Sequence, residues 1–272
     1  MTSPAKLTLL TFNIGNPSAD RARRQLDWLT SRDEQILVLT ETKDSAGCHL
    51  LADAFAGAGH QVVHRWPEYG HYGTMVVSRV EAEPDPFPDR VGYLAARAAA
   101  AAVPTDLGPL RLIGLYVPSR DASAEKTERK TKWLAACHAA LAGSEHLPTV
   151  LLGDLNILEP DHSPRYPFFA PFEYDFYRAL LDEHCLVDAF RVLHPTDAAY
   201  SWVGRSGDGY RYDHAFCSAA LRDRVEACDY LDEPRLTKLS DHSALTLTLT
   251  IPGAQPRPIT VAGGADEPDT LF

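Results

Sequence analysis

Four short segments of the chain place carboxylates, amides and an imidazole where runs of apolar residues begin or end. TVLL precedes one of these segments and ALTLTLTI follows another, and both runs are typical of buried strands. Charged side chains are seldom buried unless they are paired or bind a metal. Such a set is suited to hold a divalent cation and a water molecule against a phosphate ester. The residues are Asn13 in TFNIGN, Glu41 in LTETK, Asp154 and Asn156 in GDLN, and Asp241 and His242 in SDH.

Glu41 lies at the end of the apolar run ILVLT, and we interpret its carboxylate as a direct metal ligand. Enzymes usually bind Mg²⁺ through one or two carboxylates together with water and phosphate oxygens. The alternative interpretation is a salt bridge between Glu41 and Lys43.

Asp154 and Asn156 follow TVLLG, in which Gly153 permits a sharp exit from the strand. The carboxylate of Asp154 can orient or deprotonate a water molecule, and the amide of Asn156 can donate to a phosphoryl oxygen. Because side chains alternate along a strand, residues two apart should point the same way. The alternative interpretation is a polar turn after a strand.

An acidic group and an imidazole flank the strands near the end of the chain. Asp213 in GYRYDHAFCS is expected to pair with His242, because a carboxylate fixes the tautomer and charge of a histidine. Asp241 is expected to be a second acidic group near the metal. Alternation should turn His214 away from Asp213.

Two further polar residues end predicted strands. Asn13 ends the first strand, and Tyr116 ends LIGLY, where its hydroxyl can donate to a phosphoryl oxygen. The alternative for Tyr116 is a tyrosine at the edge of the core. No single motif is specific for this chemistry. The combination of six motifs, each at a strand end and in this order, is a specific signal.

The elements that must position these residues follow from the apolar pattern. Runs rich in Leu, Val and Ile predict central strands covered on both faces. The alanine-rich segment 94–103 has helix propensity, yet its place before 111–116 favours a strand. Alternating strands and helices indicate a layered α/β fold. The predicted strands are 7–12, 35–40, 61–64, 74–78, 111–116, 149–153, 214–218 and 244–251, and the predicted helices are 20–31, 49–57, 124–143 and 176–184.

The length of 272 residues is compatible with one catalytic domain over 1–251, followed by a flexible tail rich in Pro and Gly over 252–272. The five cysteines include no CxxC pair, so we expect reduced, buried thiols. No apolar run approaches the roughly 20 residues of a membrane span, and the N-terminus resembles a strand rather than a signal peptide. We therefore expect a cytoplasmic protein with no membrane partner.

The net charge of −11 argues against tight, sequence-independent DNA binding. A metal-lined cleft adds its own positive charge, so the argument is not decisive. Basic residues cluster between Arg120 and Lys132. They form either a local positive patch or a solvated helix face.

The motifs resemble those of the endonuclease/exonuclease/phosphatase superfamily, with most similarity to exonuclease III and the abasic-site endonucleases. The likeness spans roughly residues 6–250 and includes the strand segment YGTMVVSR. It implies roles for the following segments: TFNIGN (Asn13, near the metal), LTETK (Glu41, metal ligand, with Lys43), LYVPS (Tyr116), GDLNI (Asp154 and Asn156), GYRYDHAFCS (Asp213) and SDHSAL (Asp241 and His242).

Two departures from the family pattern affect substrate choice. Ser119 stands where nucleases usually carry Asn, with Arg120 following it in the expected substrate-binding segment, and Gly15 stands where the first motif usually has Asn or Asp. Trp202, Tyr210 and Tyr212 fall where relatives specific for abasic DNA place the wall of a sugar pocket. They could exclude a normal base while admitting an extrahelical sugar. The alternative is aromatic core residues near a turn.

The resemblance implies a four-layer α/β sandwich, in which two packed β-sheets are flanked by helices as in deoxyribonuclease I. It implies a Mg²⁺- or Mn²⁺-dependent phosphodiesterase that acts on DNA in repair. Cleavage 5′ of an abasic site or removal of groups from a 3′ end would be its reaction. The alternatives are a hydrolase of RNA or of a small phosphorylated molecule, and a catalytically silent binding module.

The expected partner is duplex DNA, and we expect a monomer. The tail ends EPDTLF, and its Leu271 and Phe272 resemble the short peptides that dock into the bacterial sliding clamp. A plain unstructured end is the alternative.

Overall fold

The first β-sheet has six strands, with the N-terminal strand near its centre. Its strands are β1 (Leu7–Asn13), β2 (Ile36–Thr42), β3 (Gln61–His64), β4 (Gly73–Ser78), β13 (Val225–Leu231) and β14 (Ala244–Leu249). The strand order is β13-β14-β1-β2-β4-β3, in which only β1 and β2 pair in parallel. The computed structural model describes residues 6–144 and 147–257 of the chain.

The second sheet also has six strands: β5 (Glu83–Pro84), β6 (Ala98–Val103), β7 (Leu110–Tyr116), β8 (Thr149–Asp154), β9 (Leu186–Asp188) and β12 (Asp213–Ser218). Their order is β5-β6-β7-β8-β12-β9, and only β7 and β8 are parallel. Both sheets are therefore mixed.

The two sheets pack face to face around one apolar core. Leu9 and Val38 of the first sheet belong to the same buried cluster as Leu112 and Val150 of the second. The sheets approach each other closely at Gly114 on β7, where a Cβ atom would lie 2.7 Å from Cγ1 of Val38. A side chain at this position would have to part the sheets or displace Val38.

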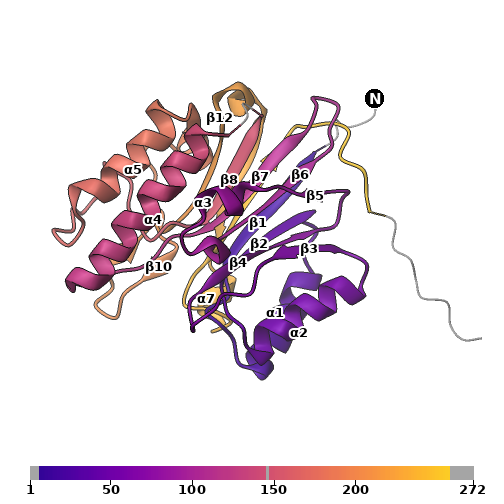
Figure 1. Ribbon diagram of the computed structural model, residues 1–272, viewed down its shortest axis with the longest axis horizontal. Helices are drawn as coiled ribbons and strands as arrows, with labels where there is room; N and C mark the ends of the chain where they lie inside the picture. Colours follow the sequence, from indigo (N-terminus) through magenta and orange to yellow (C-terminus); the bar gives the residue numbers. More distant parts are fainter. Residues whose placement is uncertain (1–5, 145–146, 258–272) are drawn as a thin grey trace, which may run out of the picture.

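Helices cover the outer face of each sheet (Figure 1). The helices α1 (Ala19–Thr30) and α2 (Ala46–Gly57) pack on the first sheet, and α3 (Phe87–Val91), α4 (Ala124–Ala142) and α5 (Pro171–Asp182) pack on the second. Alternation along β1 explains the layering: Leu9 faces the inter-sheet core, and Leu10 packs in the cluster that contains Trp28 of α1. Four layers result.

Shorter elements complete the structure. A two-stranded ribbon of β10 (Trp202–Val203) and β11 (Gly209–Tyr210) stands apart from both sheets, and an isolated bridge joins Trp202 to His242. The others are the 3₁₀ helices η1 (Ala95–Arg97) and η2 (Ala219–Arg224) and the helices α6 (Ala189–Leu193) and α7 (Glu233–Leu236).

All eight predicted strands and four predicted helices are present, and all but the strand over 61–64 have at least one shifted end. The alanine-rich segment forms η1 followed by β6, which confirms the strand over 98–103. Helix α5 begins five residues earlier than predicted, at Pro171, because proline is favourable in the first turn of a helix. Of the two alternatives for the basic cluster, the solvated helix face is wrong for Lys130 of α4, which is 1% exposed.

The segment after β14 begins with ordered contacts. The amide of Asp106 donates to the carbonyl of Pro252, and the amide of Arg257 donates to the carbonyl of Arg79. The remainder of the expected tail, including Leu271 and Phe272, lies outside the described residues. All five cysteines are free, four are buried, and Cys185 is exposed, which corrects the expectation for that residue. Across residues 6–144 and 147–257, the helices are too short or too polar to cross a membrane.

Candidate active site

The ends of strands from both sheets meet around Asp154, the last residue of β8. On the second sheet, Asp154 lies in register with Tyr116 of β7 and with Asp213 of β12. From the first sheet, Nδ2 of Asn13 donates a hydrogen bond of 2.9 Å to Oδ2 of Asp154. This hydrogen bond joins the two halves of the sandwich at the candidate site.

A β-bulge positions Glu41. The pairing of β2 with β4 shifts register between Thr40 and Thr42, and Glu41 between them has a φ of +57°. A bulge with one residue in the left-handed region turns a side chain out of the normal alternation, and such backbone strain is common at functional sites. The Tyr116 hydroxyl donates a hydrogen bond of 2.5 Å to Oε1 of Glu41.

Two residues that flank Asp154 also have positive φ angles. Gly153 has a φ of +144°, and a Cβ atom there would lie 2.0 Å from the carbonyl oxygen of Leu115, so only glycine fits. Asn156 has a φ of +50° and follows the strand, so the alternation expected for Asp154 and Asn156 does not apply. Its amide N–H donates to Oδ1 of Asp154 at 2.8 Å, and its side chain donates to the carbonyl of Val117 at 3.1 Å.

His242 and Asp213 form the predicted pair. Nδ1 of His242 donates to Oδ2 of Asp213 at 2.7 Å, and both residues are buried. Burial alone would lower the pKa of His242, but the Asp213 carboxylate raises it to about 10, so the imidazole is a cation at neutral pH. His214 faces elsewhere, as alternation predicted, and its Nε2 lies 3.1 Å from the carbonyl oxygen of Ile157.

Negative charge is concentrated at this point. Ligand atoms of Asp154, Asp213 and His242 all lie within 4.8 Å of one another. Burial, followed by the charge of Asp213, raises the pKa of Asp154 well above its usual range. Oδ1 of Asp213 is buried and accepts no hydrogen bond from the residues that the structure describes. Burial and the charges of Glu41 and Asp154 also raise the pKa of Tyr116, which keeps its hydroxyl protonated as a donor.

An aromatic wall stands beside this cluster. Trp202, Tyr210 and Tyr212 contact one another, with ring centroids 5.3 to 6.2 Å apart. The centroid of Tyr212 lies 6.5 Å from that of His242. Nε1 of Trp202 donates to Oδ2 of Asp241 at 3.0 Å, so the wall also fixes the exposed carboxylate of the SDH motif.

Three predicted substrate-binding residues lie outside this hydrogen-bonded cluster. Lys43 makes no ion pair with Glu41 among the described residues, and its Nζ instead lies 4.2 Å from the ring centroid of Tyr72, which packs on Tyr116. Ser119 is exposed. The Arg120 guanidinium forms a buried ion pair with Glu173 at 2.6 Å, and Lys130 pairs with the same carboxylate.

Sequence reasoning missed several residues that support the cluster. The Ser240 hydroxyl donates to the carbonyl of Asn13 at 2.6 Å and accepts from the amide of His242. Arg97 donates to the carbonyl of Tyr116, and Lys130 donates to the carbonyl of Asn156 at 2.6 Å. Ser240 could have been identified from its place in SDH. Arg97 and Lys130 carry no local signal, because their partners are distant in the sequence.

Comparisons with known proteins agree over most of the chain. A model of the Endonuclease/Exonuclease/phosphatase family matches residues 10–242. The DNA repair nuclease APEX1 of Danio rerio is 27% identical over 268 residues, which cover 91% of this chain and 83% of that protein. A DNA-(apurinic or apyrimidinic site) endonuclease of Arabidopsis thaliana is 27% identical over 53% of this chain and 50% of its own length.

Solved structures share the fold. An AP endonuclease from Archaeoglobus fulgidus superposes with a TM-score of 0.75 at 24% identity, over 89% of this chain and 99% of that one. The 3′ phosphatase NExo from Neisseria, bound to a product DNA hairpin, gives a TM-score of 0.74 at 26% identity over 89% and 98%. These matches confirm the four-layer sandwich.

Proposed function

Because the chain belongs to the Endonuclease/Exonuclease/phosphatase family, we propose that it is a divalent-metal-dependent nuclease that hydrolyses phosphate esters of DNA during repair. The observation that carries the proposal is the buried group of Asp154, Asp213 and His242, whose ligand atoms lie within 4.8 Å of one another at the meeting point of both sheets. Groups of carboxylates whose charges are not fully compensated are typical of catalytic sites.

The residues fit Mg²⁺ or Mn²⁺. The donors at the site are mostly carboxylate oxygens, which these ions prefer, and the unpartnered Oδ1 of Asp213 together with the raised pKa of Asp154 indicates a deficit of positive charge. We assign the metal to Glu41, with Asn13 and Asp241 nearby. When bound, the ion would neutralise charge that develops on the phosphoryl oxygens.

Asp154 is proposed to orient and deprotonate the attacking water. Its oxygens already accept hydrogen bonds from the Asn13 side chain and the Asn156 amide, which fix the carboxylate in one orientation. A base that is held rigidly and has a raised pKa is matched to proton abstraction near neutral pH. The water would then attack phosphorus in line with the leaving group.

The remaining side chains are proposed to hold the non-bridging oxygens. Asp213 engages Nδ1 of His242 and keeps the imidazole charged, which leaves Nε2 to donate to the phosphate. Tyr116 and Asn156 are assigned the same task. The Tyr116 hydroxyl has a single proton and donates it to Glu41, so it must exchange that partner to reach a phosphoryl oxygen.

For the substrate we propose duplex DNA, cut 5′ of an abasic site or processed at a 3′ end. The names of the relatives support both reactions, since they include abasic-site endonucleases and the 3′ phosphatase NExo. We also propose that residues 1–251 act as one domain in a cytoplasmic monomer. Hydrolysis of RNA or of a small phosphoester is a second candidate, favoured by the net charge of −11 and by Ser119.

One experiment tests these proposals together. Purified protein is offered an abasic duplex, a 3′-phosphate duplex, RNA and an aryl phosphodiester, each with Mg²⁺, Mn²⁺ or EDTA. We expect metal-dependent cleavage of one or both DNA substrates, with rates that fall steeply as salt is raised. Equal rates with EDTA would contradict the metal assignment. Cleavage of RNA or the aryl ester alone would support the second candidate.

A further inference from the structure

The loop that follows β8 encloses a cavity of about 480 Å³ against the start of α5. Its walls include the aromatic rings of Tyr166, Phe169 and Tyr174, two prolines, and the side chains of Arg165 and Arg178. The function proposed above uses none of these residues. The loop belongs to the segment ILEPDHSPRYPFFAPFEYD at 157–175, which is rich in prolines and aromatic residues.

The cavity is continuous with the aromatic wall of the candidate active site. The ring of Tyr166 stacks on that of Tyr210, with centroids 4.3 Å apart and planes inclined by 22°. Tyr210 stacks on Tyr212 at 5.3 Å and 20°, and Phe169 also contacts Tyr212. Near-parallel rings therefore lead from His242 outward to the cavity.

The chemistry of the walls matches a nucleotide whose base is unpaired. Unpaired bases stack on aromatic side chains, and arginines contact the flanking phosphates or the ring faces. Arg165 is exposed and has no hydrogen bond or ion pair among the described residues, whereas Arg178 shares a solvent-exposed ion pair with Asp175. The volume is of the size that binds one small ligand.

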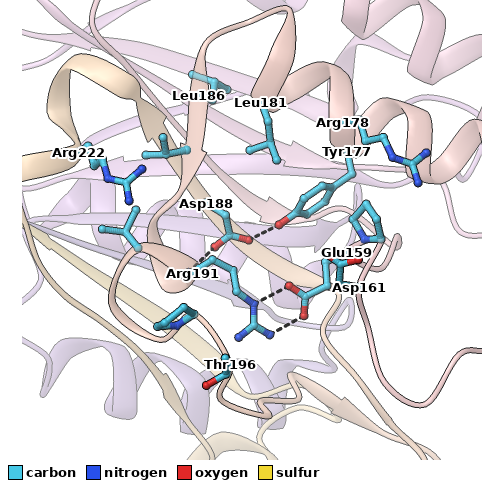
Figure 2. A pocket seen from close by; sticks show the side chains of 14 residues that line it. Glu159, Asp161, Tyr177, Arg178, Leu181, Leu186, Asp188, Arg191, Thr196 and Arg222 are labelled. Atoms are coloured by element: carbon cyan, nitrogen blue, oxygen red, sulfur yellow. Dashed lines mark hydrogen bonds and ion pairs between the residues drawn. The ribbon is translucent and has the colours of Figure 1, made fainter.

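A larger neighbouring cavity of about 870 Å³ offers a contrast (Figure 2). Its central charged groups satisfy one another: Arg191 forms a bidentate pair with Glu159, and Tyr177 donates to Asp188. It shares Pro160 and Arg178 with the smaller cavity. The smaller cavity is the one whose walls include three aromatic rings and whose Tyr166 and Phe169 contact the aromatic wall of the candidate site.

We propose that the smaller cavity binds one unpaired terminal nucleotide of the DNA strand that is processed, so that frayed or mispaired 3′ ends are preferred. The inference rests on the proposed function. A mispaired terminal base enters the cavity, stacks on Tyr166 and places its phosphate group near Arg165, while the scissile phosphate lies at the carboxylate cluster.

The test compares two duplexes that end in a 3′-phosphate and differ only in whether the terminal nucleotide is paired or mispaired. The measured quantity is the ratio of kcat/KM for the two ends. Because mispaired ends fray in any case, the change of this ratio between variants is decisive. We expect Tyr166→Ala to lower the ratio by about fivefold or more, as for the loss of one base–aromatic stack. Tyr166→Phe should retain it.

Matched controls separate the cavity from the fold and from catalysis. Arg165→Ala should also lower the ratio, whereas Arg222→Ala, at an exposed arginine of the larger cavity, should leave it unchanged. Hydrolysis of bis(4-nitrophenyl) phosphate, which has no base, should be the same in all variants. An unchanged ratio in both Tyr166→Ala and Arg165→Ala would overturn the proposal.

The two proposals fail in different ways. If the wild-type protein cleaves no DNA, the proposed function fails, and the cavity is then tested by binding. A 2-aminopurine at the mispaired terminal position should be quenched by the wild-type protein and less by Tyr166→Ala. Equal quenching by both proteins would reject the cavity as a nucleotide site.

Discussion

The protein contains two groups of buried charged side chains, one around Arg211 and one around Asp213. Although these two residues are only two positions apart in the chain, the groups differ in the ratio of positive to negative charges. Around Arg211, the guanidinium bonds both Glu159 and Asp188 at 2.7 Å, and Arg191 adds a second cation. Burial alone would raise the pKa of Asp188, but Arg211 lowers it below its usual range. Two cations thus face two carboxylates.

Around Asp213 the balance is different. The carboxylates of Asp154 and Asp213 lie close to the imidazolium of His242, the charge of Glu41 also acts on Asp154, and the pKa of Asp154 is raised instead of lowered. The comparison shows how burial serves two purposes in one protein. The balanced group holds α5, β9 and the loop after β8 together, whereas the unbalanced group around Asp213 is the one that we propose binds a cation and a phosphate.

The largest effect is expected from Asp154→Asn, which removes the proposed base while preserving its shape. Turnover should fall by about 10³-fold or more, since a positioned general base contributes up to roughly 10⁴-fold. The fold should persist, although the thermal midpoint should fall slightly, because both carboxylate oxygens accept hydrogen bonds from N–H donors and the new NH₂ group faces one of them. Cleavage assays and calorimetry measure the two quantities. Wild-type turnover would remove Asp154 from the mechanism.

In the balanced group, Arg211→Met should affect stability and leave the chemistry of the folded protein intact. Removal of one partner leaves Glu159 and Asp188 buried without compensation, which costs about 3–5 kcal/mol of unfolding free energy. Urea denaturation measures this cost, and Arg222→Met is the exposed control. A loss below about 1 kcal/mol would show that the network is dispensable.

Low pH should also reduce the stability that the balanced group contributes. Burial alone would raise the pKa of Glu159, but hydrogen bonds from Arg191 and the charge of Arg211 lower it from 4.5 to about 2. A depressed carboxyl pKa stabilises the fold above the unfolded value of 4.5, and this contribution of about 3 kcal/mol is lost as the pH falls toward 2. Denaturation at several pH values should show a smaller acid dependence in Glu159→Gln.

The smallest effect on activity is expected from a substitution of Trp202, which links the aromatic wall to Asp241. Trp202→Phe keeps an aromatic ring but removes the hydrogen bond to Asp241. Because Asp241 is exposed, we expect a loss of less than about tenfold in kcat/KM, which corresponds to one ordinary hydrogen bond. A loss as large as that of Asp154→Asn would place Asp241 at the centre of the site.

The sequence predicts those strands and helices whose local apolar pattern matches the way they are buried in the folded protein. The apolar runs of β1, β2, β8 and β14 specify central strands, and the polar residues at their ends specify the candidate site. Strand β13 escapes prediction because VEACDYL is a half-exposed edge strand with charges among its apolar residues.

Other features depend on contacts that no local window contains. Lys130 appears in a run of basic residues, yet it is buried because Glu173, 43 residues away, accepts a hydrogen bond from its Nζ at 2.6 Å. The bulge at Glu41 arises from pairing with β4. The stacking of Tyr166 on Tyr210 joins a loop to a ribbon more than 40 residues later in the chain, so the cavity beside them could not be foreseen.

The hydrogen bond from Asn13 to Asp154 ties catalytic competence to the alignment of two separate sheets. Elsewhere between the same two sheets, Gly114 leaves room for the side chains of Val38 and Thr74 of the facing sheet. Any slippage of one layer over the other would misdirect the carboxylate while every strand and helix persisted. During gradual denaturation, enzyme activity should therefore be lost before the circular dichroism signal changes, because activity depends on the alignment of the two sheets.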